Sequence, residues 1–123
     1  MKFSQEYSPS DNVITGYGSG FIEINRQKFE KNLLVFPDRD TQIWVCDSIQ
    51  SADQTSLMTI IEYKPELVVL GSGAHFAFPD FELQAWLQAN GVGCEVMDSA
   101  AACRTYNVLL AEKRKVAAAL LLP

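Results

Sequence analysis

The chain has 123 residues, of which 48% are hydrophobic, and this size and composition are typical of a single domain with one core. Its formal net charge of −5 argues against the broad basic surface that binding to nucleic acid requires. The cysteines, Cys46, Cys94 and Cys103, cannot all form pairs, and no apolar leader or membrane-length segment is present. We therefore expect a reduced, cytoplasmic protein that does not insert into a membrane.

The N-terminal half has the composition of short β-strands. Residues 1–11 lack an apolar period, and we expect a loose arm there, followed by a single α/β domain over residues 12–123. The β-prone runs are 13–15, 21–24, 32–36 and 42–46, separated by glycines, by Asn25-Arg26 and by Pro37-Asp38. These runs predict hairpins or a small curved sheet.

The C-terminal half alternates helices and strands. A helix with Leu57, Ile60 and Ile61 on one face must end before Pro65. Strands are predicted over 67–70 and 92–96. The helix between them starts at Pro79, has Phe81, Leu83, Trp86 and Leu87 on its apolar side and closes at Gly91. Another helix starts at Ser99, and the apolar segment 116–122 returns to the core.

This order of elements is a run of crossover units, which predicts a parallel or mainly parallel sheet. The ends of the strands 67–70 and 92–96 then lie at the same edge, so the loop Gly71 to His75 comes near Asp98 and Ser99. Function in open α/β sheets is commonly located at such an edge. Asp98 and Ser99 start the last helix, where they cap its amide groups or, alternatively, leave them free for an anion.

The last helix has two different faces. Ala102, Tyr106, Leu109 and Leu110 lie on one side, and Ala100, Arg104, Asn107 and Ala111 lie on the opposite side. Small residues with one arginine and one asparagine permit close approach of another group. That face is therefore either simply exposed or a contact surface for another element, another chain or an anion, with Arg104 as a planar donor.

Two residues are candidates for catalysis. Cys103 lies in the first turn of the helix beside Arg104, a position that lowers the pKa of a thiol, and His75 is the one histidine of the chain. The alternative for Cys103 is a small buried hydrophobic residue, because it borders the apolar face. For His75 it is a loop residue with local hydrogen bonds.

No cofactor or metal is expected. The run 71–76 resembles the start of a dinucleotide fingerprint, but Phe76 replaces the third glycine and the following helix starts too late. Asp38 and Asp40 have no histidine or cysteine at ligand spacing. The basic run 113–115 is interpreted as a charged turn rather than a patch for an anionic partner.

Several segments together resemble a known family. They are Ser19–Ile24, Leu33–Pro37, Trp44, Pro65–Gly73, Glu95–Asp98 and Arg104–Leu109. At these residues the chain resembles a widespread family of small conserved proteins of unknown function. Its members include an adipogenesis-associated protein and a mitochondrial assembly factor for respiratory complex I.

The resemblance implies a single α/β domain with a central mixed, mostly parallel sheet, flanking helices and an additional small β layer from the N-terminal half. Lys113 departs from the family, in which glycine often follows the helix, so a different turn conformation is expected there. The resemblance supplies no catalytic residues, and its eukaryotic members indicate protein assembly.

The first hypothesis is therefore a non-catalytic binding or assembly module, monomeric or weakly self-associating, that docks an unidentified protein partner. The candidate binding residues are Gly71, Ser72, Gly73, His75, Asp98, Ser99, Arg104 and Asn107. The alternative is a small-molecule enzyme or sensor that uses the crevice between Gly71–His75 and Asp98–Arg104, with Cys103 or His75 as the reactive group.

Overall fold

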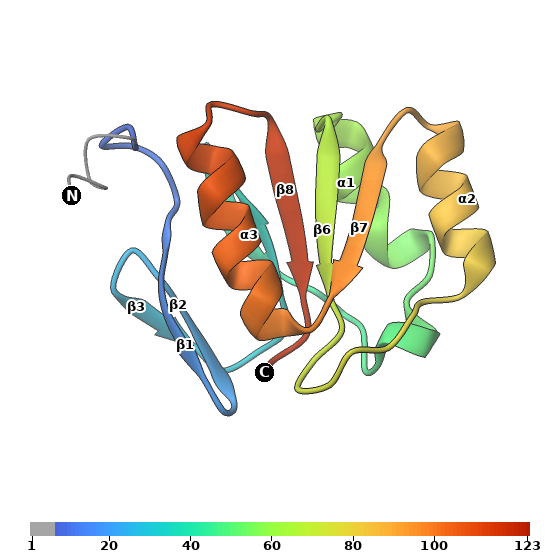
Figure 1. Cartoon of the computed structure of the whole chain (residues 1–123), viewed down its shortest axis with the longest axis horizontal. Helices are drawn as coiled ribbons and strands as arrows, with labels where there is room; N and C mark the ends of the chain where they lie inside the picture. The colour runs from blue at the N-terminus through green and yellow to red at the C-terminus, as the bar shows by residue number, and fades with distance from the viewer. Residues whose placement is uncertain (1–6) are drawn as a thin grey trace.

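Two continuous apolar runs form the centre of the molecule, which a computed structural model describes over residues 7–123 (Figure 1). In β6 (Leu67–Gly71) and β8 (Val116–Leu120) every residue is buried. The two strands pair in parallel, and β7 (Gly93–Met97) pairs in parallel with the other side of β6. Strands buried on both faces require such uninterrupted apolar sequence.

The two crossover helices cover opposite faces of this sheet. The helix α2 (Phe81–Ala89) joins β6 to β7, and α3 (Ser99–Ala111) joins β7 to β8. Leu83 and Leu87 of α2 share a buried cluster with Val68 and Leu70, whereas Tyr106 of α3 belongs to a second cluster on the other face. The predicted order of strands and helices, with their ends at one edge, is confirmed.

The N-terminal half extends the sheet in the antiparallel direction. The strand β4 (Leu33–Phe36) pairs with β8, and β5 (Arg39–Ile43) pairs with β4, so the order is β5-β4-β8-β6-β7. The sheet is mixed, as the family resemblance implies, and an all-parallel sheet is wrong. The predicted strand 42–46 is displaced, because the tight turn after Phe36 lets pairing resume at Arg39.

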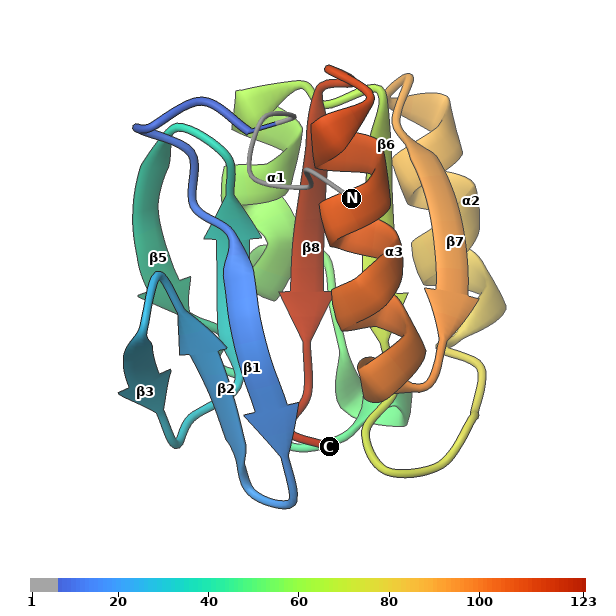
Figure 2. The same ribbon diagram turned by 60° about the vertical axis from the view of Figure 1, so that its left-hand side comes forward.

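A separate three-stranded antiparallel sheet forms the additional β layer. It consists of β1 (Ile14–Gly18), β2 (Phe21–Ile24) and β3 (Gln27–Phe29). Asn25 and Arg26 both have positive φ, 49° and 70°, as a tight hairpin turn requires, and β3 follows where no strand was predicted. Figure 2 shows this sheet beside α3, in front of β4 and β5, so the small sheet and α3 lie on the same face of the five-stranded sheet.

Short helical segments connect β5 to β6. Two 3₁₀ turns, Ile49–Ser51 and Thr55–Leu57, lead into α1 (Met58–Tyr63), which ends before Pro65 as predicted. The helix α2 begins at Phe81 with Asp80 as its N-cap, so Pro79 precedes the helix instead of opening it. Gly91 has φ +79°, the left-handed conformation expected after this helix.

The expected arm, residues 1–11, lies partly outside the described residues, which begin at Tyr7. Ser8 and Asp11 form a turn in which the Ser8 amide donates to the Asp11 carboxylate at 2.9 Å. Among residues 7–123, no helix combines the length and the apolar character needed to cross a membrane.

Candidate functional site

The carboxyl ends of the three parallel strands meet at one edge of the sheet. The Leu121 amide donates to the Gly71 carbonyl oxygen at 3.1 Å, and the Ser72 amide donates to the Met97 carbonyl oxygen at 2.9 Å. The sheet register thus places the loop after β6 against the start of α3. This is the juxtaposition that the sequence predicts for Gly71–His75, Asp98 and Ser99.

Ser99 holds the loop to the helix. Its side chain is buried, and its Oγ accepts a hydrogen bond from the Gly73 amide at 2.8 Å. In return, the Ser99 amide donates to the Gly73 carbonyl oxygen at 2.9 Å. The predicted N-cap is therefore displaced by one residue, because the long-range bond to Gly73 occupies the Ser99 hydroxyl.

Asp98 is the N-cap of α3. Its Oδ1 accepts from the Ala101 amide at 2.9 Å, and its carbonyl oxygen accepts from the Ala102 amide at 2.9 Å. Together with the Ser99 amide, these donors are satisfied within the chain. A carboxylate already occupies the position that an anion would take, so the arrangement favours capping over anion binding.

Gly71 and Gly73 permit this close contact. A Cβ at Gly71 would lie 2.7 Å from the Ser99 Oγ and 3.1 Å from the Ser99 Cα. Gly73 has φ +104°, a conformation that residues with side chains rarely adopt. Both glycines therefore have structural roles at the point where β6 meets α3.

Ser72 shapes the rest of the loop. Its Oγ donates to the His75 carbonyl oxygen at 2.7 Å and accepts from the Ala77 amide at 3.1 Å. The His75 side chain is exposed. Because α2 does not begin until Phe81, the loop glycines are not at the N-terminus of the helix that follows them, where the pyrophosphate of a dinucleotide would bind.

A crevice of about 350 Å³ lies beside this loop. Ser72, Gly73 and His75 line one side, and segments 47–50 and 121–122 line the others. Asn32 joins these segments, because its amide group donates to the Cys46 carbonyl oxygen at 2.7 Å and its Oδ1 accepts from the Leu122 amide at 2.8 Å. Sequence reasoning missed Asn32, since nothing local marks its two distant partners.

One flank of α3 contacts β1 of the same chain. Asn107 makes a paired contact with one residue: its Oδ1 accepts from the Ile14 amide at 3.0 Å, and its Nδ2 donates to the Ile14 carbonyl oxygen at 2.8 Å. Arg104 donates from Nη1 to the Tyr17 hydroxyl at 2.7 Å, and its side chain is exposed. The group that Asn107 contacts is therefore β1 of the same chain, and not another chain or an anion.

Cys103 is fully buried in the cluster between α3 and the sheet. Burial raises the pKa of its thiol to about 12, and the nearby charge of Arg104 opposes this shift without overcoming it. A thiol that is protonated at neutral pH and shielded from solvent is not suited to nucleophilic attack. The environment fits the alternative interpretation, a small core residue.

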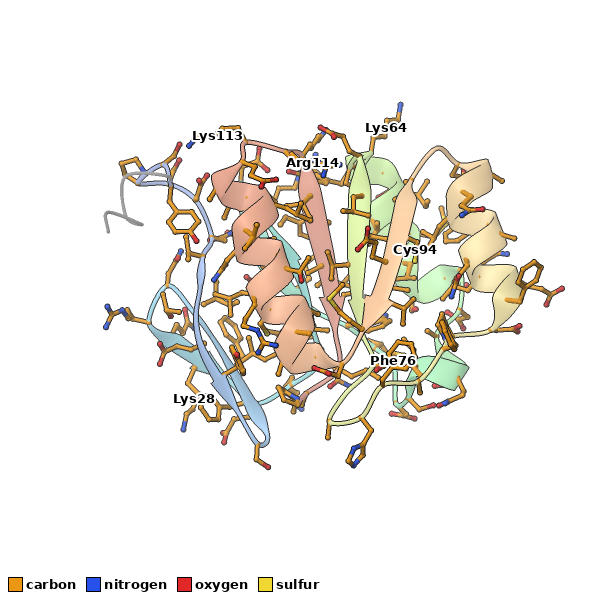
Figure 3. All side chains as sticks on the ribbon, in the orientation of Figure 1. Lys28, Lys64, Phe76, Cys94, Lys113 and Arg114 are labelled. Carbon is orange, nitrogen blue, oxygen red and sulfur yellow. The ribbon has the colours of Figure 1, made fainter. Side chains whose placement is uncertain are left out.

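Three exposed phenylalanines follow the loop, and we call Phe76, Phe78 and Phe81 the aromatic surface. Their exposed fractions are 53%, 64% and 81%, and the rings of Phe76 and Phe78 meet edge to face with centroids 4.8 Å apart. Figure 3 shows Phe76 on the loop between β6 and α2. The sequence analysis placed Phe81 on the apolar side of α2, whereas Leu83 and Leu87 form that side and Phe81 points elsewhere.

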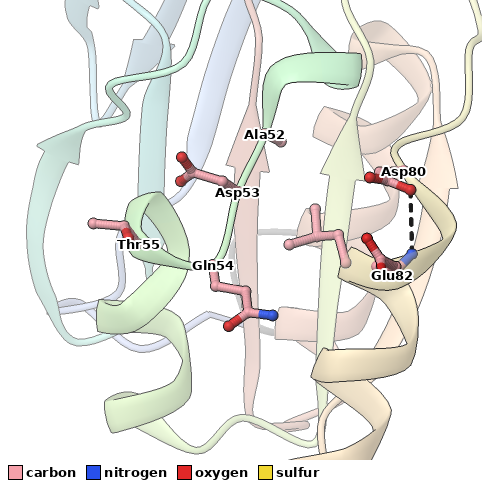
Figure 4. A pocket seen from close by; sticks show the side chains of 7 residues that line it. Ala52, Asp53, Gln54, Thr55, Asp80 and Glu82 are labelled. Atoms are coloured by element: carbon pink, nitrogen blue, oxygen red, sulfur yellow. Dashed lines mark hydrogen bonds between the residues drawn. The ribbon is translucent and has the colours of Figure 1, made fainter.

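An acidic pocket of about 330 Å³ lies between the 3₁₀ segments and the start of α2 (Figure 4). Asp53, Asp80 and Glu82 line it, and the Asp80 carboxylate accepts from the Glu82 amide at 3.4 Å. Among residues 7–123, no three histidine, cysteine or acidic side chains are arranged to hold a metal ion.

The basic turn at residues 113–115 lies at the opposite end of the sheet. Arg114 contacts Glu66 at 3.4 Å, and the Lys115 Nζ lies 4.6 Å from the centroid of the Tyr63 ring. Lys113 has φ +64°, the left-handed conformation that glycine favours, although the substitution suggested a different turn. These contacts agree with the interpretation as a charged turn.

Comparison with known proteins identifies the family to which this chain belongs. Residues 14–121 match the family described as "Protein of unknown function (DUF498/DUF598)". The chain belongs to this family. An uncharacterised family relative from Rhodobacter capsulatus is 36% identical over 108 residues, which cover 88% of this chain and 82% of that protein.

A second relative of this DUF498/DUF598 protein has a name that describes a role. It is the "NADH dehydrogenase (ubiquinone) 1 alpha subcomplex assembly factor 3" of Danio rerio, 40% identical over 125 aligned positions that cover 100% of this chain and 71% of that protein. Among solved structures, a Bordetella parapertussis protein matches with a TM-score of 0.88 and 33% identity, covering 94% of this chain and 99% of that one.

Proposed function

We propose that this protein is a non-catalytic docking module that holds a protein partner through the aromatic surface while a larger complex is assembled. The observation that carries the proposal is the exposure of Phe76, Phe78 and Phe81 beside the loop that sequence analysis singled out. Phe76 and Phe78 are in ring contact, and exposed apolar side chains that adjoin one another are typical of interaction sites. Aromatic residues are also enriched among the residues that dominate binding energy.

The free energy of burying phenylalanine side chains supports the aromatic surface as the docking site. Full burial of one phenylalanine side chain contributes about 1.5–3 kcal/mol relative to exposure, so three such side chains are enough for a specific anchor. The surface is also attached to a rigid support. Ser72 orders the loop internally, and Ser99 fixes Gly73, so little conformational entropy is lost when a partner binds.

Arg104 is a further candidate for a polar contact with a partner, separate from the aromatic surface. Its side chain is exposed, and its guanidinium keeps further donors beyond the one used by Tyr17. His75, next to Phe76 in the chain, is also exposed and can supply a polar contact beside the phenylalanines.

The assembly role rests on the relative from Danio rerio, whose name describes an assembly factor of NADH dehydrogenase. We infer that the partner of this chain is a subunit of a comparable multisubunit complex. The free cysteines Cys46, Cys94 and Cys103 fit a reducing compartment such as the cytoplasm.

Crosslinking followed by affinity capture tests this proposal. The wild-type protein is compared with the double variant Phe76→Ser and Phe78→Ser, and with Val108→Ser, which removes an apolar side chain of similar exposure, 55%, from α3. We expect wild type and Val108→Ser to capture subunits of one complex, and the double variant to recover about tenfold less.

Two results contradict the proposal. Equal capture by the three proteins, with circular dichroism showing all of them folded, excludes the aromatic surface. A captured set without subunits of any multisubunit complex excludes the assembly role. The variant Arg104→Glu, measured in parallel, is expected to reduce capture less than the double variant, because Arg104 lies outside the aromatic surface.

A second candidate function is a small-molecule enzyme or sensor. The crevice of about 350 Å³ between the loop Ser72–His75 and segments 47–50 and 121–122 favours it, since this volume is within the range of small-molecule sites, although Asp98–Arg104, expected to form one wall, do not line it. An NMR screen against a metabolite library, repeated with His75→Ala, distinguishes the two functions. Binding in the crevice that His75→Ala abolishes supports this candidate, and shifts confined to the aromatic surface contradict it.

A further inference from the structure

The outer edge of β5 is open for pairing. This strand is the last of the five-stranded sheet, and within residues 7–123 its one neighbour is β4. The Trp44 amide donates toward β4, to the Asn32 carbonyl oxygen at 2.8 Å, and the Cys46 carbonyl oxygen accepts from the Asn32 side chain. Because successive residues of an extended chain direct their polar groups to alternate sides, Ile43 and Val45 direct theirs outward.

Apolar side chains accompany these backbone groups. Ile43, Val45 and Met58 are exposed by 51%, 84% and 44%. A groove of about 370 Å³ runs between the edge and α1, lined by Leu34, Gln42, Ile43, Val45, Asp53, Thr55, Ser56 and Thr59. The strand β5 itself is mainly polar, so the exposed apolar side chains at this edge are those of Ile43 at its end and Val45 just after it.

The charges at this edge are negative. Asp40 lies at its start, Asp47 lies just after its end, and Asp53 lines the groove, with all three side chains exposed. In Figure 4 the Asp53 side chain points away from Asp80 and Glu82. The cation of β5, Arg39, is turned onto Tyr63, with its guanidinium carbon 4.6 Å from the ring centroid.

We propose that β5 binds an extended segment of another protein by strand addition, and that this segment alternates apolar residues and carries Lys or Arg at both ends. Its backbone pairs with Ile43 and Val45, its apolar side chains enter the groove between β5 and Thr59, and its cations approach Asp40 and Asp47. A second copy of this chain fits less well, because it brings the same acidic residues and a net charge of −5 to the edge.

This binding mode is independent of the aromatic surface, since it involves different elements. The test is an NMR titration of the isotope-labelled protein with the synthetic peptide KKVTVTVKK and with its matched acidic version EEVTVTVEE. We expect the lysine peptide to slow hydrogen exchange of the Ile43 and Val45 amides and to bind about tenfold more tightly than the glutamate peptide. Added salt should reduce this difference.

Variants locate the effect. Val45→Pro removes an outward amide at a position beyond the end of β5, so the fold is retained while affinity for the lysine peptide falls about tenfold. Val108→Lys, a change at an exposed apolar residue of α3, is expected to leave the affinity unchanged.

Three results overturn the proposal: unchanged exchange of the Ile43 and Val45 amides at saturating peptide, equal affinity for both peptides, or a stable dimer in sedimentation that the lysine peptide does not dissociate. Shifts confined to residues 76–81 also overturn it, while supporting the docking role of the aromatic surface.

Discussion

The helices α2 and α3 cover opposite faces of the same sheet, but their neighbours differ. One flank of α3 contacts the small sheet, where Asn107 holds Ile14 and the Tyr106 hydroxyl donates to the Asn12 carbonyl oxygen at 2.8 Å. The buried cluster of α2 includes no residue of the small sheet, and Phe81 at the start of α2 is exposed. The small sheet thus packs beside one helix and not the other, which leaves the surface near α2 as the candidate for a partner.

This contrast separates residues with structural partners from the residues proposed to bind a partner. Polar side chains near α3 that resembled a site, such as Ser99 and Asn107, have long-range partners inside the chain. Phe81 at the start of α2, which was predicted on the apolar side of the helix, faces solvent. Changes on the α3 side should therefore affect stability, and changes on the α2 side should affect binding.

Gly71→Ala should have the largest effect on stability. The new Cβ would lie 2.7 Å from the Ser99 Oγ and close to the Ser99 backbone, so the junction of β6 and α3 must shift. We expect the free energy of unfolding to fall by about 3 kcal/mol in urea titrations. The control is Gly16→Ala, whose nearest contact is the flexible Glu23 side chain at 3.3 Å, and a loss as large as that of Gly71→Ala would refute the explanation.

Asn107→Ala should detach β1 from α3. Two hydrogen bonds to Ile14 are lost, and we expect the free energy of unfolding to fall by about 2 kcal/mol, with faster hydrogen exchange in β1. Val108→Ala, at the adjacent exposed position, serves as the control. Unchanged exchange of the Ile14 amide in Asn107→Ala would show that the small sheet is held by other contacts.

The thiol of Cys103 should make stability depend on alkaline pH. Its pKa is raised to about 12 from the ordinary 9.0, so the folded state holds the proton more tightly than the unfolded state. The contribution is complete below pH 9 and is lost as pH rises toward 12, by about 1.4 kcal/mol per pH unit. Between pH 9 and pH 10, the free energy of unfolding should therefore fall less for Cys103→Ala than for wild type. An equal fall in both proteins would contradict the raised pKa of Cys103.

The smallest stability effect is expected on the α2 side. The double variant Phe76→Ser and Phe78→Ser should change the free energy of unfolding by less than about 0.5 kcal/mol, because both rings are mainly exposed. Thermal unfolding provides the measurement. A loss comparable with that of Asn107→Ala would mean that the aromatic surface supports the fold and would weaken the contrast between the two helices.

The predictable part of the fold is the part encoded locally. The apolar run 67–70, the glycines that end it and the next strand define crossover units from neighbouring residues alone. The antiparallel addition of β4 and β5 was not predictable in this way, because β4 pairs with β8 across most of the chain, as in Leu33 with Leu120. Local patterns carry no information about such a partner.

The candidate site shows the same division. The meeting of Gly71–His75 with Asp98 and Ser99 followed from the crossover rule. The crossover rule could not tell which of Asp98 and Ser99 caps α3, because this depends on the hydrogen bond between Ser99 and the distant Gly73. The sequence indicated that Asn107 makes a contact but did not identify Ile14 as its partner. Phe81 was predicted on the wrong side of α2, because the direction of each side chain depends on the residue at which the helix starts.

The docking role of the aromatic surface is the central claim, and site-specific photo-crosslinking in cells tests it most directly. A photoreactive phenylalanine analogue is placed at Phe78 and, as the matched control, at Val108, both exposed apolar positions. Position 78 should crosslink to one subunit of a multisubunit complex, while position 108 gives no such product. Crosslinking to the same proteins from both positions, or to none from position 78, would contradict the account.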